Sequence, residues 1–229
     1  MIKLIPLDNP ELFKWTECLH KPPSHLYAKG DVTLLESRPK VAIIGSRTMT
    51  NYGRAMISQI VPGLVHAGCT IVSGGAMGVD VESQRKALEY EGKVITILGN
   101  GLNNPAPKTN QPFFWRVEQR GLLLSEFEPD QPAGKYTFPQ RNRLISAMSD
   151  LVLIVEARKK SGALITADFA AAHGKPVACI PGRASDEMSY GCNELIKQGA
   201  HMVTTVTEII TLLNIQLSPK QLKLIDLYS

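Results

Sequence analysis

The sequence predicts an α/β protein with an extended Rossmann-like, doubly wound and mainly parallel sheet. Apolar runs of six or seven residues recur along the chain, helix-length segments separate them, and the two alternate over most of its length. Runs that are apolar throughout, with no polar alternation, are typical of strands covered on both faces. A chain that alternates such strands with helices builds an open parallel sheet with right-handed crossovers.

The expected strands follow in order. VAIIGS is the first, CTIVSG ends near paired glycines, and PVACIPG ends in a Pro-Gly turn signal, while HMVTTV is a weaker candidate because it is less apolar. The predicted strands are 41–46, 69–74, 93–99, 121–126, 151–157, 176–182 and 201–206. The segments between them predict helices near 53–67, 78–91, 112–119, 140–149, 163–173, 190–198 and 207–214.

Three segments are expected along the chain. Residues 1–38 break the strand–helix rhythm with Pro6, Pro10, Pro22 and Pro23, so they predict an N-terminal lead-in that packs on the core. Residues 39–214 form the Rossmann-like domain. Residues 215–229 predict a short C-terminal tail that begins a helix and then stops.

Composition favours a single soluble domain. The 229 residues are 44% hydrophobic and 20% charged, and the net charge of +4 is compatible with an anionic partner without requiring one. No apolar run approaches the length of a membrane span, so we expect a cytoplasmic protein with no membrane contact. The four cysteines form no Cys-x-x-Cys pair, which predicts free thiols and no metal site.

Small residues stand where several predicted strands meet the next helix. Because the carboxyl ends of parallel strands lie at one edge of a sheet, these turns should be close together. Glycine lets backbone N–H groups approach a phosphate at a helix start. One glycine pair is equally compatible with a tight turn that holds no ligand, but the repetition favours phosphate binding. The turn residues are Gly45, Ser46, Gly74, Gly75, Gly78, Asp80, Ser161, Gly162 and Thr166.

Cations gather in the same loops, which is the electrostatic pattern expected for a polyanion site. For Arg158, Lys159 and Lys160, a simple solvated loop is the favoured interpretation. For Arg141 and Arg143, ligand binding competes with a second interpretation, in which they pair with buried carboxylates such as Glu126 or Glu156. The predicted binding residues on this side are Arg47, Lys108, Asn110, Arg141, Asn142 and Arg143.

The sequence favours binding over catalysis. It contains no P-loop, no Gly-x-Gly-x-x-Gly after the first strand, no Gly-x-Ser-x-Gly and no His-Glu-x-x-His, so no cofactor is expected. Single-stranded nucleic acid is bound by a basic groove with aromatic platforms, and Phe138, beside Arg-Asn-Arg, is the best stacking candidate. Four phosphate contacts would give a log–log salt slope of about −3.

Ordered sequence blocks resemble the DNA-processing protein A family (DprA/Smf). They include VAIIGSR, IVSGGAMGVD, FPQRNRLIS, SGALITA and GCNELIKQGA, and the resemblance spans about residues 20–212. It implies an extended Rossmann fold, a homodimer, cooperative binding of single-stranded DNA and loading of the RecA recombinase during natural transformation or recombination. By the same resemblance, Arg47 and Lys108 correspond to residues that grip DNA phosphates.

The chain also departs from the family pattern. Met77 stands where the family usually has arginine, and Asn-Asn-Pro-Ala-Pro at 103–107 replaces the usual Asp and Tyr-Pro. We expect neither the helical N-terminal domain nor the C-terminal winged helix that many members add.

Two other functions stay open. A phosphoribohydrolase-like enzyme has similar glycine-rich turns, but its Pro-Gly-Gly-x-Gly-Thr-x-x-Glu motif is absent here. A nucleotide-binding sensor would need saturable binding of mononucleotides.

Overall fold

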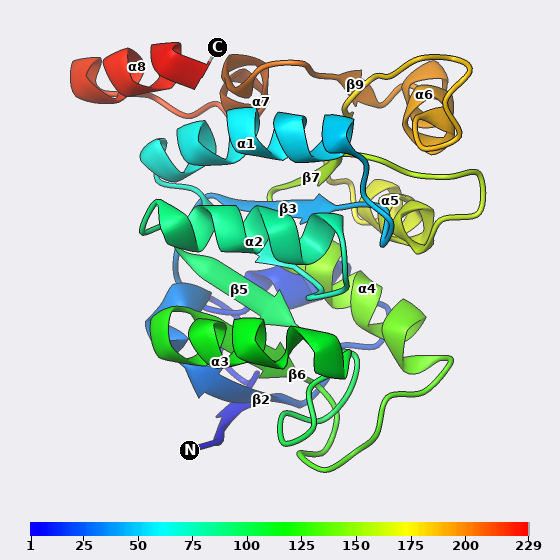
Figure 1. Ribbon diagram of the computed structural model, residues 1–229. Helices are drawn as coiled ribbons and strands as arrows, with labels where there is room; N and C mark the ends of the chain where they lie inside the picture. The colour runs from blue at the N-terminus through cyan, green and yellow to red at the C-terminus, as the bar shows by residue number, and fades with distance from the viewer. Residues whose placement is uncertain (229) are drawn as a thin grey trace.

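Nine strands form a single sheet in the computed structural model, which describes residues 1–228 (Figure 1). The strand order is β1-β2-β6-β5-β4-β3-β7-β8-β9, and the pairs from β6 through β9 are parallel. The predicted doubly wound, mainly parallel α/β fold is confirmed. The strands are β1 Lys3–Pro6, β2 His25–Gly30, β3 Lys40–Ile44, β4 Thr70–Ser73, β5 Val94–Ile97, β6 Leu122–Ser125, β7 Leu151–Ile154, β8 Val177–Cys179 and β9 His201–Met202.

Helices cover both faces of this sheet because its buried strands are apolar on both sides. Val41 and Ile43 of β3 face one hydrophobic cluster, and Ala42 and Ile44 face the other. Figure 1 shows α1, α2 and α3 side by side in front of the sheet. The helices are α1 Asn51–His66, α2 Val79–Glu89, α3 Gln111–Arg120, α4 Thr137–Met148, α5 Gly162–Ala172, α6 Tyr190–Lys197, α7 Val206–Leu212 and α8 Pro219–Ile225.

The N-terminal residues add two strands that the sequence analysis missed. β1 pairs antiparallel with β2, and β2 pairs antiparallel with β6, with Tyr27 opposite Ser125. Trp15 and Leu34 from the same segment are buried in the cluster behind the sheet. Proline and mixed polarity hide these strands from a pattern search, since they lie at the edge of the sheet. The division of the chain at residues 38 and 214 stays a prediction.

Predicted strands extend too far at their carboxyl ends. The segment expected at 151–157 pairs only as far as Ile154, because the chain then leaves β8 and the Ala157 amide donates to the Met188 carbonyl at 2.8 Å. The weak candidate at 201–206 ends at Met202, since Thr205 and Glu208 form a capping box that starts α7. The tail does form a helix: α8 is held to α1 by the Gln221 side chain, whose Nε2 donates to the His66 carbonyl at 3.0 Å.

The strand order contains one reversal. From β3 the chain proceeds through β4 and β5 to β6 on one side, and it then returns to place β7 on the other side of β3. The loops that follow β3 and β7 therefore run in opposite directions and leave a crevice between them, where ligands bind in open α/β sheets.

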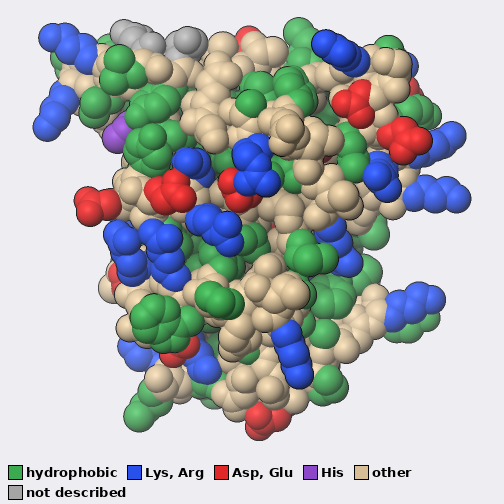
Figure 2. Space-filling view, viewed as in Figure 1, with side chains coloured by type: hydrophobic (Ala, Val, Ile, Leu, Met, Phe, Trp, Pro, Cys, Tyr) green, Lys and Arg blue, Asp and Glu red, His purple; other side chains and the backbone are tan. Residues whose placement is uncertain are grey.

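The described part of the chain contains no helix that could span a membrane. None of the helices within residues 1–228 combines the length and the apolar character needed to cross a bilayer. Figure 2 shows Lys and Arg side chains on both the left-hand and the right-hand sides of this face, with Asp and Glu among them. Across the same residues no group of three or more His, Cys, Asp or Glu side chains could hold a metal ion. The four cysteines are free thiols.

Lys40 at the start of β3 is a buried cation whose titration should affect stability. Its side chain is 1% exposed, and its Nζ donates to the carbonyls of Leu35, at 2.8 Å, and Ser37. Burial and, to a smaller extent, the nearby charge of Arg38 lower the pKa of Lys40 to about 8, although Asp150 acts in the opposite direction. The folded protein thus binds this proton more weakly than the unfolded chain does.

We therefore expect the contribution of Lys40 to the free energy of unfolding to increase as the pH rises from about 8 to about 10.4, by on the order of 1–2 kcal/mol. Urea unfolding of the wild type and of Lys40→Met across this range measures the difference between them. The difference should change in favour of the wild type with rising pH, and a constant difference would contradict the assignment. Other titrating groups are common to both proteins and cancel.

Candidate functional site

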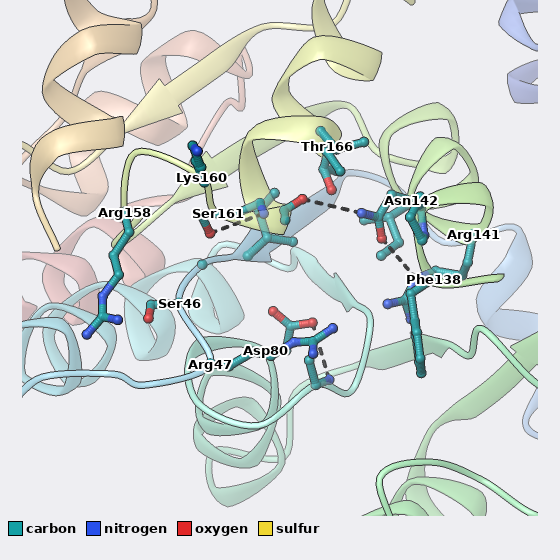
Figure 3. Close-up of a pocket in the computed structure, with 18 residues that line it drawn as sticks. Ser46, Arg47, Asp80, Phe138, Arg141, Asn142, Arg158, Lys160, Ser161 and Thr166 are labelled. Atoms are coloured by element: carbon teal, nitrogen blue, oxygen red, sulfur yellow. Dashed lines mark hydrogen bonds between the residues drawn. The ribbon is translucent and has the colours of Figure 1, made fainter. Parts of the chain in front are cut away.

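A cavity of about 410 Å³ occupies the crevice at the strand reversal. Its walls come from the β3–α1 loop, the start of α2, the first turns of α4, and the β7–α5 loop with the start of α5. Figure 3 shows Arg158 and Lys160 on one side of the cavity and Phe138, Arg141 and Asn142 on the other. Ten of the residues predicted from the sequence line it: Gly45, Ser46, Arg47, Asp80, Phe138, Arg141, Asn142, Ser161, Gly162 and Thr166.

Three cations of the cavity point outward. Arg47, Arg158 and Lys160 are exposed, and none of them forms an ion pair with a residue in the described part of the chain. The Arg47 guanidinium lies over the Phe138 ring, 5.7 Å from its centroid. A cation over an aromatic face is attracted by the ring quadrupole, and this contact orients both groups toward the same space. The outer part of the cavity therefore combines positive charge with a planar apolar surface.

The start of α5 adds backbone donors to the same cavity. Ser161 is its N-cap, and the hydroxyl accepts the Ala163 amide at 3.3 Å. A Cβ added at Gly162 would meet no atom within 4 Å, so space is open above this turn. The positive end of the helix dipole favours an anion here. Thr166, one turn on, is buried under this surface.

Arg141 forms the floor of the cavity, and it is an internal cation. Its side chain is 4% exposed, and Nη1 donates to the carbonyls of Gly74, at 2.7 Å, and Ile97. Its Nε donates to Asn142 Oδ1 at 3.1 Å. This bond orients the Asn142 side chain so that its Nδ2 donates to the Gly162 carbonyl at 3.4 Å. Burial lowers the pKa of Arg141 to about 10, and Asp80 opposes that change, so the group stays charged at neutral pH.

Asp80 is the buried counterpart of Arg141. The carboxylate is 6% exposed and accepts the amides of Gly74 at 3.2 Å and Ala76 at 3.3 Å. Burial raises the pKa of Asp80, while Arg141 and the two amides hold that rise back. Aspartate at this position therefore stabilises the turn between β4 and α2, and its charge partly offsets that of Arg141.

The glycines after β4 make room for the protein's own groups. A Cβ at Gly74 would lie 2.6 Å from the Arg141 guanidinium, and one at Gly75 would lie 2.7 Å from the Phe114 ring. Gly78 has a φ of 79°, which favours glycine, and a Cβ added there would lie 2.2 Å from the Ser46 carbonyl oxygen. The structure does not place these three residues on the lining of the cavity.

Three other predicted residues also lie outside the cavity lining. Arg143 pairs with Glu126 at 2.5 Å and is largely buried, which is the ion-pair alternative considered for it. Asn110 donates to the Gly75 carbonyl at 3.0 Å, and Lys108 is exposed in the one-turn 3-10 helix Lys108–Asn110. Glu156, the other carboxylate considered, accepts the Thr50 amide at 2.9 Å and the Thr50 hydroxyl.

The sequence analysis missed part of the lining. Arg158 and Lys160 were interpreted as a solvated loop, yet both line the cavity. Their position directly after β7 was the available signal, because that strand is the neighbour of β3. The apolar residues Ala76, Pro139, Ala163 and Ile165 left no signal distinct from core packing.

The fold and the crevice together define a doubly wound α/β protein with a cavity lined by cations at the strand reversal. A family model described as DNA recombination-mediator protein A matches residues 3–214, and the chain belongs to this family. The resemblance seen in the sequence blocks is thus confirmed.

Relatives and solved structures agree with this assignment. The chain is 34% identical to the DNA processing protein DprA of Bacillus subtilis, over 91% of this chain and 70% of that protein. It spans 50% of a putative DprA from Mycobacterium tuberculosis. The structure of DprA from Streptococcus pneumoniae superposes with a TM-score of 0.88 at 32% identity, covering 95% of this chain and 75% of that one. A structure of DNA processing protein A from Helicobacter pylori, which concerns its single-stranded DNA binding mode, superposes with a TM-score of 0.84 at 35% identity, covering 93% and 96%.

Proposed function

We propose that the cavity at the strand reversal, called the switch-point cavity or switch-point crevice from here on, binds the backbone of single-stranded DNA. The chain then acts as a recombination mediator: it covers incoming strands and loads RecA onto them in natural transformation or recombination. The observation that carries this proposal is the convergence of Arg47, Arg158 and Lys160 with the α5 N-terminus at one crevice. Cations without ion-pair partners and the positive end of a helix dipole both favour phosphate. The single-stranded DNA binding of the Helicobacter pylori relative supports the choice of ligand.

The form of the crevice favours a single strand over a duplex. The Phe138 ring, oriented by Arg47, lies among the cations, and an unpaired strand presents both phosphates and base faces to such a surface. The bases of a duplex are stacked on each other and cannot reach a ring at the side of a crevice. Phe138 therefore gains a partner only when the strand is unpaired.

The lining supports binding rather than catalysis. Among the described residues that line the cavity there is no histidine or cysteine, and the carboxylate present, Asp80, is buried and held by two amides. A general base must reach the proton that it removes. We propose accordingly that the chain is not an enzyme and needs no cofactor. A cytoplasmic location, a homodimer and contact with RecA belong to the same proposal.

Titration of oligonucleotides tests this function. Fluorescence anisotropy should show binding of oligo-dT that strengthens with length, exceeds the binding of a duplex of the same length, and has a log–log salt slope of about −2 for three phosphate contacts. Saturable binding of thymidine monophosphate with no dependence on length would instead identify a nucleotide sensor. Release of free base from a nucleoside monophosphate would identify an enzyme. Either of these results would overturn the proposal.

A further inference from the structure

A second cavity opens beside the switch-point crevice, where α1 begins and the β8–α6 loop turns. Its volume is about 630 Å³. The β8–α6 loop follows the strand next to β7, so both cavities open at the carboxyl ends of neighbouring strands, which lie about 5 Å apart. The residues that line it are Tyr52, Pro181, Gly182, Arg183, Asp186 and Ser189.

The loops around the two cavities contact one another directly. Ser46, in the wall of the first cavity, lies with its Oγ 3.5 Å from the Met188 sulfur. The Met188 carbonyl accepts the Ala157 amide at 2.8 Å, and Ala157 precedes the cationic loop that begins at Arg158. The walls of the two cavities therefore adjoin through these loops.

The second cavity is held in shape by internal hydrogen bonds. The Tyr52 hydroxyl donates to the Pro181 carbonyl at 2.6 Å, which fixes the plane of the ring. The Asn193 side chain bonds both backbone groups of Gly182, at 3.2 Å and 3.0 Å. A Cβ at Gly182 would lie only 1.9 Å from Ser189 Oγ, so the floor excludes any larger residue. A ligand that enters pays little ordering entropy, since the walls are already fixed.

The chemistry of the second cavity differs from that of the first. Arg183 supplies one positive charge and Asp186 one negative charge, so the lining is nearly neutral and offers little attraction for a phosphate. It offers aromatic surface instead. The Tyr52 ring is 41% exposed although its hydroxyl is bonded. Tyr190, which follows Ser189, is 39% exposed, and Lys159 Nζ lies 5.4 Å from its ring centroid. Every base has a π-face that can stack on such rings.

We propose that this second cavity is a base subsite for the same DNA strand whose phosphates occupy the switch-point crevice, with Tyr52 as the stacking platform. The inference depends on the proposed function. It assigns phosphate contacts to Arg47, Arg158 and Lys160, and base contacts to Tyr52 and Arg183. A strand long enough to span both cavities is bound more tightly than one that fills only the first.

The test compares variants over an oligo-dT series from the dinucleotide to about 16 nucleotides, by fluorescence anisotropy with competition for the shortest ligands. Tyr52→Ala should weaken the binding of the longer oligonucleotides by about five- to tenfold, which corresponds to the loss of one stacked base. The increase of affinity with oligonucleotide length should also become smaller. Arg183→Ala should act in the same direction to a smaller extent. Arg120→Ala, an exposed arginine at the end of α3, is the matched control and should follow the wild type.

The outcomes separate the two proposals. If Tyr52→Ala and Arg183→Ala follow the wild type at every length while Arg47→Ala loses affinity, the base subsite is wrong and the proposed function stands. If Tyr52→Ala weakens all lengths equally, the second cavity is not a separate subsite. If Arg47→Ala also binds normally, both proposals fail. Photo-cross-linking of 5-iodouracil oligonucleotides to the wild type is independent of variant folding: adducts at Tyr52 or Tyr190 support the subsite, and adducts confined to residues of the first cavity overturn it.

Discussion

Replacing Arg47 by alanine is expected to weaken the binding of single-stranded oligo-dT by about 10- to 100-fold at low salt. A charged group that bonds a phosphate contributes about 1.5–3 kcal/mol, and the substitution also leaves Phe138 without the cation over its ring. The loss should be the same for every base sequence, because phosphates are common to all of them. The log–log salt slope should become less steep by about 0.7. Fluorescence anisotropy at several salt concentrations measures both quantities.

Two comparisons make the Arg47 result specific. Arg47→Lys keeps the charge and should keep most of the salt slope, although it loses the planar contact with Phe138. Lys108→Ala changes an exposed cation that does not line the cavity, so it should have a smaller effect on affinity. Equal affinity and equal slope in the wild type and Arg47→Ala would show that the cavity does not contact the DNA backbone.

Removing Arg141 should destabilise the protein more than any exposed substitution. Arg141→Ala leaves the carbonyls of Gly74 and Ile97 without their donor and Asp80 without its counter-charge. Each buried acceptor left without its donor costs about 1–3 kcal/mol, and the loss of a nearby positive charge adds to this for Asp80. Urea unfolding should therefore show a large fall in the midpoint. Arg158→Ala is the matched control, since that exposed side chain should change the free energy of unfolding by less than about 0.5 kcal/mol.

The Arg141 effect should depend on pH in a defined direction. Burial raises the pKa of Asp80 above its value in the unfolded chain, so the folded state binds this proton more tightly. Protonation then removes the uncompensated charge that Arg141→Ala creates. The difference in unfolding free energy between Arg141→Ala and the wild type should become smaller as the pH falls from neutral toward the raised pKa of Asp80. A difference that stays constant or grows on acidification would contradict the pairing.

The central strands could be predicted from sequence because burial on both faces leaves a continuous apolar run. Val41–Ile44 and Leu151–Ile154 show this directly, and both lie in the middle of the sheet. β1 and β2 could not be predicted, because prolines and polar residues interrupt the apolar run near the edge of the sheet, as Pro6 does at the end of β1. Strand ends were placed too late for a related reason: Glu156 and Ala157 are buried like strand residues, yet their backbone partners, Ser46 and Met188, lie outside the ladder.

The position of the candidate site was accessible from the sequence, but the orientation of its side chains was not. Arg47 and Arg141 are both arginines in carboxyl-edge segments, yet one is exposed over a ring and the other is buried against two carbonyls. Residue type cannot distinguish these states, because they depend on which backbone groups the tertiary structure leaves unpaired. Arg158 and Lys160 were set aside for the opposite reason, since a run of charges is usually only solvated.

The contact at Gly74 shows that the Gly74–Gly75 pair is a poor indicator of ligand binding. Only glycine fits at this position, because a Cβ would lie 2.6 Å from the buried Arg141 guanidinium. Sequence searches based on the glycine pair would therefore find chains that share an internal arginine bonded to backbone carbonyls, whatever they bind at their surface. Outward features, such as the arginine after the first central strand and the cations after β7, are the better discriminators of ligand among distant homologues.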